Sequence, residues 1–299
     1  MQMEHKVEAT AAHHKVMGLA GGSAQPDQVG PAEGAEGWRA RLQLSFAHRG
    51  GRTVLAEKRH EGPMLVQRPF YPEGGVCHIY VLHPPGGVVG GDHLFVSAEL
   101  GSDAHALITM PGATKFYRSQ GARALVRQRL KVAPGATLEW LPQDNIFFPG
   151  VQVRLDTCFE LDEGARLIAW EVQCLGRPAM DEAFSSGQLR ACFSLMRTGR
   201  PLLHENLQIA DGNLFKLGGH PLAATLVATP ADEGVLHEVR ECLKDSELLV
   251  GATLIDDLLV LRLLAHDNWA LSMTMQQVWQ HIRPLVLCRS PSTPRIWLT

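Results

Sequence analysis

The sequence predicts a mainly β protein in which layers of strands stack on one another and two α-helices follow in the C-terminal third. Three observations lead to this fold class. Apolar and polar residues alternate with a period of two in several runs, turn residues separate these runs, and the period becomes helical after about residue 230. The chain has 299 residues, 45% of them hydrophobic, which is enough for a substantial core.

The first 36 residues differ from the rest of the chain. They are rich in Gly, Ala, Pro and acidic residues and offer little to bury, so we expect a flexible tail over 1–36 and a β-rich domain over 37–299. His5, His13 and His14 lie in this tail. They could bind metal ions, although solvated histidines are the more common case in such a segment.

The first strand is expected at 38–46, where Trp38, Ala40 and Leu42 begin an apolar face and Arg39 and Arg41 begin a polar one. The same alternation predicts further strands at 94–100, 124–132, 151–161 and 189–195. Gly, Pro and Asp cluster between these runs, which indicates turns.

A weak internal repeat supports a stack of layers. Glycine turns that feed apolar strands begin at Gly101, Gly135, Gly164 and Gly199, with spacings of 34, 29 and 35 residues. Such a period favours stacked β-layers, each pairing with its neighbours. The alternative is that these glycines belong to ordinary hairpin turns in an all-β domain.

The last third carries the helical pattern. One helix is expected near 231–243, with Val235 and Val239 on its apolar stripe, and a second from Asp267 to about Pro284. Asp267 is a suitable N-cap, and Pro284 is expected to end the second helix. Residues 251–264 read as a turn and a strand, and 290–299 as an extended surface tail.

Charge and hydropathy exclude several classes of protein. There are 28 basic and 31 acidic residues, a net charge of −3, so the chain is not built to coat nucleic acid. No run of 18 apolar residues predicts a membrane span, and the N-terminus has no signal-peptide core. We therefore expect a cytoplasmic protein without a membrane or nucleic-acid partner.

The residue motifs of common enzymes and of structural zinc sites are missing. There is no GxSxG elbow, no HExxH and no CxxC pair, so neither a hydrolase nor a zinc knuckle is supported. Six cysteines are scattered along the chain and are expected to be reduced thiols, most of them buried small side chains: Cys77, Cys158, Cys174, Cys192, Cys242 and Cys288.

The glycine-rich segment HPPGGVVGGD (83–92) invites a phosphate-binding interpretation that fails. It lacks GK[ST], and the residues after it alternate as a strand instead of opening a helix. Glycine without a Cβ instead suggests a backbone that passes close to something else, with Asp92 on a tight loop. The candidate binding residues of this loop are Gly86, Gly87, Gly90 and Gly91.

The segment TKFYRS (114–119) supplies two cations, a phenol and two hydroxyls in six residues. Lys115, Tyr117 and Arg118 could form a cradle for a bound group. The alternative is an exposed loop of mixed polarity.

Carboxylates recur within apolar strands. Glu139, Glu171 and Glu205 are 32 and 34 residues apart, so stacked layers could place them above one another. A buried carboxylate requires water, a cation or an Arg beside it, and a column of them would form a hydrated cation path. Asp144, within LEWLPQDNIFFPG (138–150), is a further candidate. The alternative is that each carboxylate lies on the solvent face of its strand.

These motifs, together with CLGRP (174–178) and RIWLT (295–299), resemble the UreD family of urease accessory proteins, called UreH in some lineages. The motifs occur in family order and the resemblance covers about residues 37–299. It implies a layered, helix-like β stack of about seventeen strands with two helices.

The resemblance also implies a maturation factor that is not an enzyme. Such a protein binds apo-urease and the helical accessory protein F, which recruits the nickel-carrying GTPase G. It passes transient Ni²⁺ through an internal, water-filled acidic tunnel and holds no permanent cofactor. By motif position, the resemblance implies that Asp92, Glu171 and Glu205 line the path. At the position of Glu171, such proteins also accept Asp. Glu139 and Asp144 are added from this sequence alone.

Oxygen ligands suit such a path because they hold Ni²⁺ less tightly than thiolate or imidazole sites and let it leave. A passive scaffold that holds urease open without conducting nickel is the alternative. A hydrolase using Asp92 and the 114–119 loop would have to turn over substrate without partners.

Overall fold

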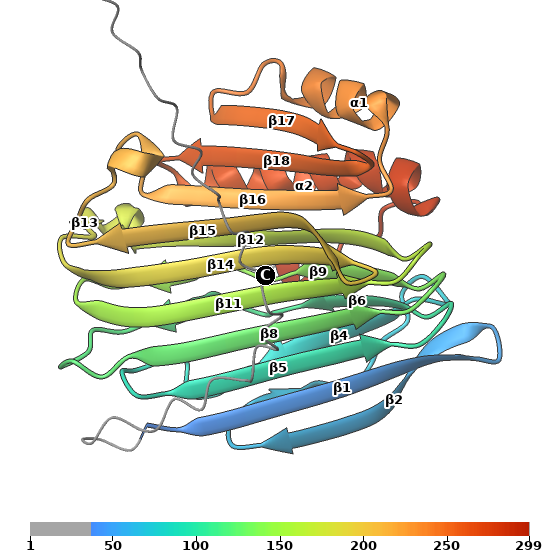
Figure 1. Cartoon of the computed structure of the whole chain (residues 1–299), viewed down its shortest axis with the longest axis horizontal. Helices are drawn as coiled ribbons and strands as arrows, with labels where there is room; N and C mark the ends of the chain where they lie inside the picture. Colours follow the sequence, from blue (N-terminus) through green and yellow to red (C-terminus); the bar gives the residue numbers. More distant parts are fainter. Residues whose placement is uncertain (1–36, 299) are drawn as a thin grey trace, which may run out of the picture. The chain divides into compact units, whose positions relative to one another are not determined.

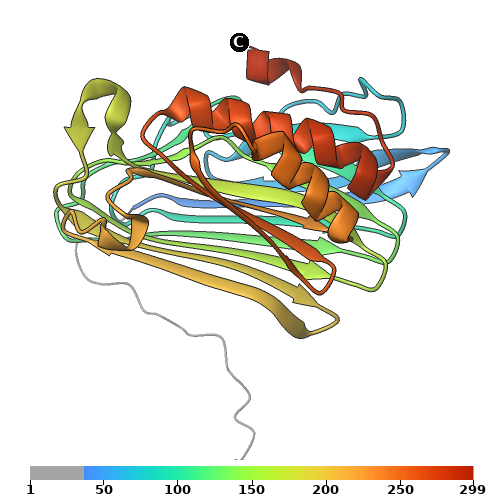
Figure 2. The ribbon, with the colours of Figure 1, turned by 90° about the horizontal axis from the view of Figure 1, so that it is seen from above.

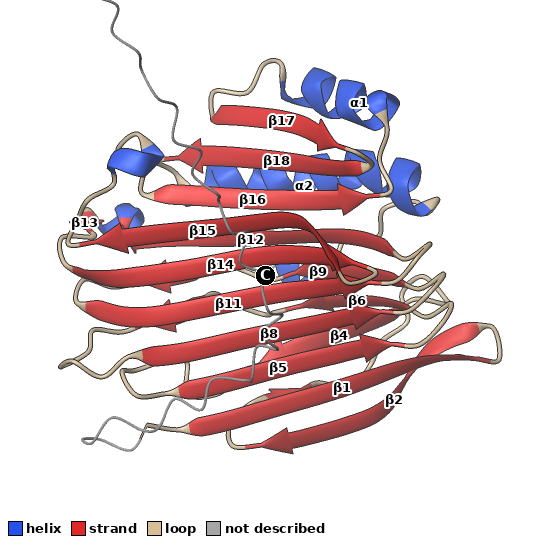
Figure 3. Cartoon of the chain, in the orientation of Figure 1, coloured by secondary structure: helices blue, strands red, loops and turns tan. Residues whose placement is uncertain are grey.

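The computed structural model describes residues 37–298, so the expected tail over 1–36 lies outside the described residues. Within them the chain forms eighteen strands and two α-helices (Figure 1, Figure 3). The mainly β prediction is confirmed, including the two late helices.

The strands form two sheets. The smaller one has seven strands in the order β15-β14-β11-β8-β5-β1-β2, and its pairs from β1 through β14 are parallel (Figure 1). Hairpins close both ends, since β1–β2 and β14–β15 are antiparallel. The strand bounds are β1 Arg39–Arg49, β2 Arg52–Glu61, β5 His93–Leu100, β8 Ala124–Val132, β11 Val151–Leu161, β14 Gly187–Arg197 and β15 Arg200–Ala210.

The larger sheet has eleven strands, with a main path β17-β18-β16-β12-β9-β6-β4-β3. The short strands β7, β10 and β13 pair beside β12. The bounds are β3 Leu65–Val66, β4 Cys77–Leu82, β6 His105–Thr109, β7 Thr114–Phe116, β9 Thr137–Leu141, β10 Asn145–Phe147, β12 Arg166–Arg177, β13 Glu182–Ala183, β16 Leu222–Thr229, β17 Leu249–Ile255 and β18 Leu258–Ala265.

The chain winds between the two sheets as a β-solenoid of about four turns. It passes from β5 to β6, from β8 to β9 and from β11 to β12, and each crossing changes sheet. The predicted turns at Gly101, Gly135 and Gly164 are these three corners, which confirms the stacked layers. Gly199 differs because it lies in the antiparallel β14–β15 hairpin, so the fourth glycine ends the repeat instead of continuing it.

Two hydrophobic layers hold the fold together. One lies between the two sheets, and the other lies between the larger sheet and the helices, which cover its outer face (Figure 2). Residues on one face of a strand alternate with those on the other, so neighbours on β12 belong to different layers. Leu167 and Ala169 pack between the sheets, whereas Ile168 and Trp170 pack under the helices.

Helix α1 spans Glu233–Leu243 and helix α2 spans Asn268–Leu287. Asp267 caps α2 as predicted, since its carboxylate accepts a hydrogen bond from the Ala270 N–H. The predicted end at Pro284 is wrong, because the helix continues for another turn. Buried Arg283, held by two carboxylates, and buried Val286 and Leu287 fix that turn despite the hydrogen bond that proline cannot donate.

Two further expectations are corrected. Residues 249–255 form strand β17, paired antiparallel with β18, where the sequence suggested a turn. The C-terminal residues do not simply extend over the surface, because Arg295–Leu298 form a 3₁₀ turn. This turn places the Trp297 ring 5.4 Å from Trp170 and 5.3 Å from Trp279. No helix in the described part of the chain is long and apolar enough to cross a membrane.

Candidate functional site: a polar row between the sheets

A line of polar side chains crosses the otherwise apolar space between the two sheets. We call it the interior polar row, and its members are Gln128, Thr157, Glu171, Gln173, Thr225, Glu205 and Arg262. Both sheets contribute to it. Glu171 pairs in register with Thr225, which pairs with Arg262, so the larger sheet carries three members side by side. The row therefore consists of two hydrogen-bonded groups, one around Glu171 and one around Glu205, which the pairing of Glu171 with Thr225 places side by side.

Glu171 lies at the centre of this row and is 4% exposed. The Thr157 hydroxyl donates to its Oε1 (2.6 Å) and the Gln173 amide to its Oε2 (2.7 Å). No cationic side chain of the described residues forms an ion pair with it. Burial raises the pKa of Glu171 to about 7 and the charge of Glu205 adds to this, although the two hydrogen bonds oppose the shift.

Gln173 leaves an unsatisfied acceptor beside that carboxyl. Its Oε1 is buried and has no hydrogen-bond partner among the described residues, and the residue is 6% exposed. An unsatisfied buried polar atom costs about 1–3 kcal/mol, so native proteins satisfy most of them with a protein group, water or an ion. The oxygens of Glu171 and Gln173 therefore offer a place for water or a cation.

Glu205 occupies the more open end of the row. It accepts hydrogen bonds from Arg262 Nε (2.5 Å) and from the Thr225 hydroxyl (2.9 Å). Its side chain is about one quarter exposed and that of Arg262 about half exposed. The row thus runs from a buried centre at Glu171 to the protein surface at Arg262.

The other end of the row meets a cavity of about 400 Å³ between the sheets. Gln128 and Asn145 line it from inside, and His83, Gly86, Gly87 and Lys115 line it from the glycine loop and from β7. Asn145 pairs in register with Gln173. Gln128 of the row therefore lines this cavity directly, and Gln173 is the strand neighbour of a residue that lines it.

The glycine loop makes the close approach that its sequence predicts. A Cβ at Gly87 would lie 2.2 Å from the Tyr117 ring, and one at Gly90 would lie 2.1 Å from Ser119 Oγ. Gly86 and Gly91 have positive φ values of 75° and 92°. The glycine loop and the 114–119 segment thus pack directly on each other, with Arg118 exposed.

Asp92 is buried and holds the start of the first strand. Its carboxylate accepts hydrogen bonds from the backbone N–H groups of Trp38 (2.8 Å) and Val89 (2.9 Å). These contacts tie the glycine loop to the residues that lead into β1. Asp92 is not a member of the interior polar row.

The expected column of Glu139, Glu171 and Glu205 is wrong for Glu139. Glu139 pairs in register with Ile168, three residues before Glu171, so the two carboxylates point to opposite faces of the larger sheet. Glu139 faces α2 instead. There it binds Arg283 (2.8 and 2.9 Å), His105 (2.8 Å) and Trp279 (2.8 Å).

The charge state of Glu139 differs accordingly. Burial acts to raise its pKa, but hydrogen bonds from His105 and Arg283 and the Arg283 charge outweigh it and lower the pKa to about 2. Arg283 also pairs with Glu73 (2.7 Å), whose carboxylate accepts a hydrogen bond from the His78 ring (2.6 Å). Glu139 is therefore part of a neutralised ionic cluster under the helices.

Asp144 also lies away from the row. The Asn268 amide of α2 donates to its Oδ2 (2.8 Å), and burial raises its pKa. Its position beside the first turn of α2 explains why it and the Glu171 carboxyl do not meet.

The sequence patterns did not lead us to the uncharged members of the row. Thr157 stands at an inward position of β11, between Leu155 and Phe159, and Gln128 stands likewise between Val126 and Leu130 of β8. A polar residue in the apolar phase of an alternating strand is the signal that could have found them. No group of three or more His, Cys, Asp or Glu side chains within residues 37–298 is arranged to hold a metal ion.

Comparisons with known proteins agree with the sequence motifs. Residues 38–298 match the family model described as UreD urease accessory protein. The urease accessory protein UreD of Pseudomonas entomophila (strain L48) is 54% identical over 272 residues, covering 91% of this chain and 98% of the relative. Those of Klebsiella pneumoniae subsp. pneumoniae and Citrobacter koseri are 52% and 51% identical, each over 88% of this chain and over 96% and 92% of the relative.

These relatives are named as accessory proteins of urease, which confirms the expectation of an accessory protein rather than an enzyme. The β-solenoid with two helices, the ordered motifs and the match over nearly all described residues lead to one conclusion. The chain belongs to the UreD family of urease accessory proteins.

Proposed function

We propose that this chain binds apo-urease during maturation and that nickel travels to it along the interior polar row. The observation that carries the proposal is the pair formed by Glu171 and Gln173. An almost fully buried carboxyl without a cationic partner lies beside a buried, unsatisfied amide oxygen. A divalent ion or the water that accompanies it would satisfy both groups.

The chemistry of the row suits an ion in transit. Its members offer carboxylate, amide and hydroxyl oxygens, and no thiolate or imidazole. Such oxygens bind Ni²⁺ less tightly than nitrogen or sulfur ligands do. The ion is cargo in this proposal, so weak and successive contacts serve better than one closed site.

The ends of the route follow from the exposure of its members. The cavity beside Gln128 forms one mouth, rimmed by the glycine loop with Gly86 and Gly87 and by Lys115. Asp92 keeps that loop in place, and the packing of Gly87 on Tyr117 holds the rim against the 114–119 segment. Glu205 forms the other mouth, where Arg262 has to release its carboxylate before an ion can take its place.

That release is inexpensive. The Glu205–Arg262 pair is partly exposed, and such pairs contribute about 0–1 kcal/mol. The partners in this scheme are apo-urease, the accessory protein F and, through F, the nickel-carrying GTPase G. Gly91 and Arg118, on the glycine loop and beside it, complete the proposed contact residues of the rim.

The experiment replaces the two carboxylates of the row. Urease activated in the presence of Glu171→Ala or Glu205→Ala should contain less nickel, measured by mass spectrometry of the purified enzyme. The matched control is Glu99→Ala, an exposed glutamate on the outer face of β5. Normal nickel content with both row variants would remove these carboxylates from the path.

A passive scaffold is the second candidate, and one observation favours it. Glu205 is held by Arg262, and within residues 37–298 no cluster of ligands is arranged around an ion. A scaffold would bind apo-urease as strongly with Glu171→Ala as without it and would load nickel equally well. The same measurement therefore separates the two candidates.

A further inference from the structure

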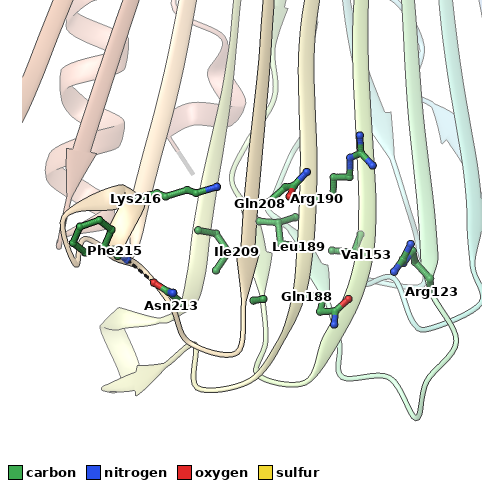
Figure 4. Close-up of a pocket in the computed structure, with 11 residues that line it drawn as sticks. Arg123, Val153, Gln188, Leu189, Arg190, Gln208, Ile209, Asn213, Phe215 and Lys216 are labelled. Atoms are coloured by element: carbon green, nitrogen blue, oxygen red, sulfur yellow. Dashed lines mark hydrogen bonds between the residues drawn. The ribbon is translucent and has the colours of Figure 1, made fainter.

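A second cavity, of about 490 Å³, lies over the outer face of the seven-stranded sheet (Figure 4). Strand register explains its form. Val153, Leu189 and Ile209 form one row across β11, β14 and β15, and their buried side chains face inward, into the layer between the sheets. The next row along these strands contains Arg190 and Gln208, whose side chains are exposed and point outward. The cavity therefore lies on the face opposite to the interior polar row.

The charged residues at this cavity are all cations. Arg123, Arg190 and Lys216 are exposed, and within residues 37–298 none of them forms an ion pair or a side-chain hydrogen bond. The cations nearby on the same sheet are different: Arg154 pairs with Asp156 at 2.8 Å. Unpaired cations around one cavity, in a chain whose net charge is −3, mark a local site for anionic groups.

An aromatic side chain stands beside these cations. Phe215 is 89% exposed, yet its backbone is fixed: its N–H donates to Asn213 Oδ1 (3.1 Å), and buried Leu217 anchors the same 3₁₀ turn (Figure 4). An exposed aromatic ring next to arginines is typical of protein–protein interfaces, where both residue types are enriched. A small inorganic anion would gain nothing from contact with this apolar ring.

The spread of the cations also favours a protein. Lys216, Arg190 and Arg123 lie on different sides of the cavity (Figure 4). Strand β11 separates β8 from β14, so the backbones that carry Arg123 and Arg190 are about 10 Å apart. Several carboxylates along an extended segment match this spacing better than one phosphate does.

We infer that this face, defined by Arg123, Arg190, Lys216 and Phe215, docks a carboxylate-rich segment of apo-urease. The inference rests on the proposed function for its choice of partner. Gln208, at the cavity, is three residues from Glu205 on β15, about 10 Å along the strand. The two side chains are on opposite faces of β15, but β15 is the edge strand of this sheet, so a partner seated on the cavity and reaching around that edge would come to the mouth at Glu205.

The test measures binding apart from nickel transfer. Purified apo-urease is immobilised, and the complex of this chain with accessory protein F is passed over it at low and high salt. We expect the triple variant Arg123→Glu, Arg190→Glu, Lys216→Glu to bind about tenfold more weakly or worse, and to lose most of the salt dependence. Phe215→Ala should weaken binding at both salt concentrations, because its contact is apolar.

A second triple variant controls for net charge. Lys58→Glu, Arg59→Glu, Arg129→Glu makes the same change on strands β2 and β8, away from the cavity, and should bind apo-urease as the wild type does. Circular dichroism checks that both triple variants fold. An unchanged affinity of the first variant, or an equal loss in the control, would overturn the inference.

Two other outcomes would also overturn it. The first variant could lose accessory protein F instead of apo-urease, which would assign the face to F. Inorganic phosphate could bind the wild type and not the variant while urease binding stays the same, which would leave a small-anion site only. Failure of the nickel route is distinguishable, since Glu171→Ala would then bind urease and load nickel normally whatever the docking result.

Discussion

Two buried glutamates on adjacent strands of one sheet have pKa values shifted in opposite directions. Glu139 on β9 faces the helices, where Arg283 and His105 bind its carboxylate and its pKa falls to about 2. Glu171 on β12 faces the other sheet, where it meets only a hydroxyl and an amide and its pKa rises to about 7. Both are at least 96% buried, so burial alone does not separate them.

The difference shows what makes a buried carboxylate structural. A neutralised one ties elements together: Glu139, Glu73 and Arg283 join β9, the 67–76 loop and the last turn of α2. One without a cation costs stability when it ionises, and it persists where something else can use it. This is the physical basis for our proposal that the ion path runs through the space between the sheets.

The largest expected effect comes from removing the cation of the first cluster. Arg283→Met leaves buried Glu139 and partly buried Glu73 without their positive charge, which should lower the free energy of unfolding by about 3–5 kcal/mol. Urea unfolding followed by circular dichroism measures it. Arg129→Met, on an exposed site of β8, is the control and should change little. A loss below about 1 kcal/mol would contradict the structural role of the cluster.

The next effect has the opposite sign. Glu171→Gln should stabilise the protein at pH 8 by about 2–3 kcal/mol, because the wild-type carboxyl must ionise while buried and without a cationic partner. The folded pKa lies above the unfolded one, so wild-type stability is greatest below pH 4.5 and decreases as pH rises to about 7. The advantage of Glu171→Gln should therefore shrink between pH 8 and pH 5 in paired urea titrations.

Glu139→Gln sharpens the same comparison, because its pH dependence should be flat over that range. The folded pKa of Glu139 is lowered, so its contribution is present above pH 4.5 and is lost only as pH falls toward 2. The variant should be less stable than the wild type by a similar amount at pH 5 and pH 8. Parallel pH trends for Glu139→Gln and Glu171→Gln would show that the two sites do not differ.

A smaller effect is expected at Thr157. Thr157→Val removes the hydroxyl that bonds Glu171 and lies 3.2 Å from Gln128 Oε1, which should cost about 1–2 kcal/mol. Because that hydrogen bond holds the pKa of Glu171 down, its loss should raise this pKa further. The decline should still begin near pH 4.5, but the pH at which it ends should move upward. Thr157→Ser, which keeps the hydroxyl, should leave that pH where it is in the wild type.

The smallest effect belongs to the open end of the row. Arg262→Ala removes the partner of Glu205, but both side chains are partly exposed, so stability should change by less than about 1 kcal/mol. Nickel loading should be kept or improved, because the carboxylate is freed. A large loss of stability would show that the pair is a structural lock, and the proposed exit would have to be placed elsewhere.

Local patterns in the sequence predicted much of the fold. Period-two runs gave the strands β1, β5, β8, β11 and β14, and three glycine turns gave the solenoid corners. Capping chemistry gave the start of α2 at Asp267. The predicted helix end at Pro284 was wrong, because packing of the last turn against the larger sheet outweighs the local preference of proline to end a helix.

The site was predictable only in part. Glu171 and Glu205 were found as carboxylates in apolar strands, and the structure brings them into one row through Thr225. Glu139 carried the same signal and lies on the other face. A shift of one residue in register reverses which face a side chain occupies, and spacing along the chain cannot fix register across strands.

Residue order alone accounts for the local features: where strands alternate, where glycine allows a corner, and where an aspartate can cap a helix. Tertiary structure alone decided which carboxylate received a cation. Arg283 lies 144 residues from Glu139 along the chain, and only the packing of α2 on the larger sheet brings them together. Charge neutralisation inside a protein depends on distances of a few ångströms, and those distances are set by the packing of whole layers.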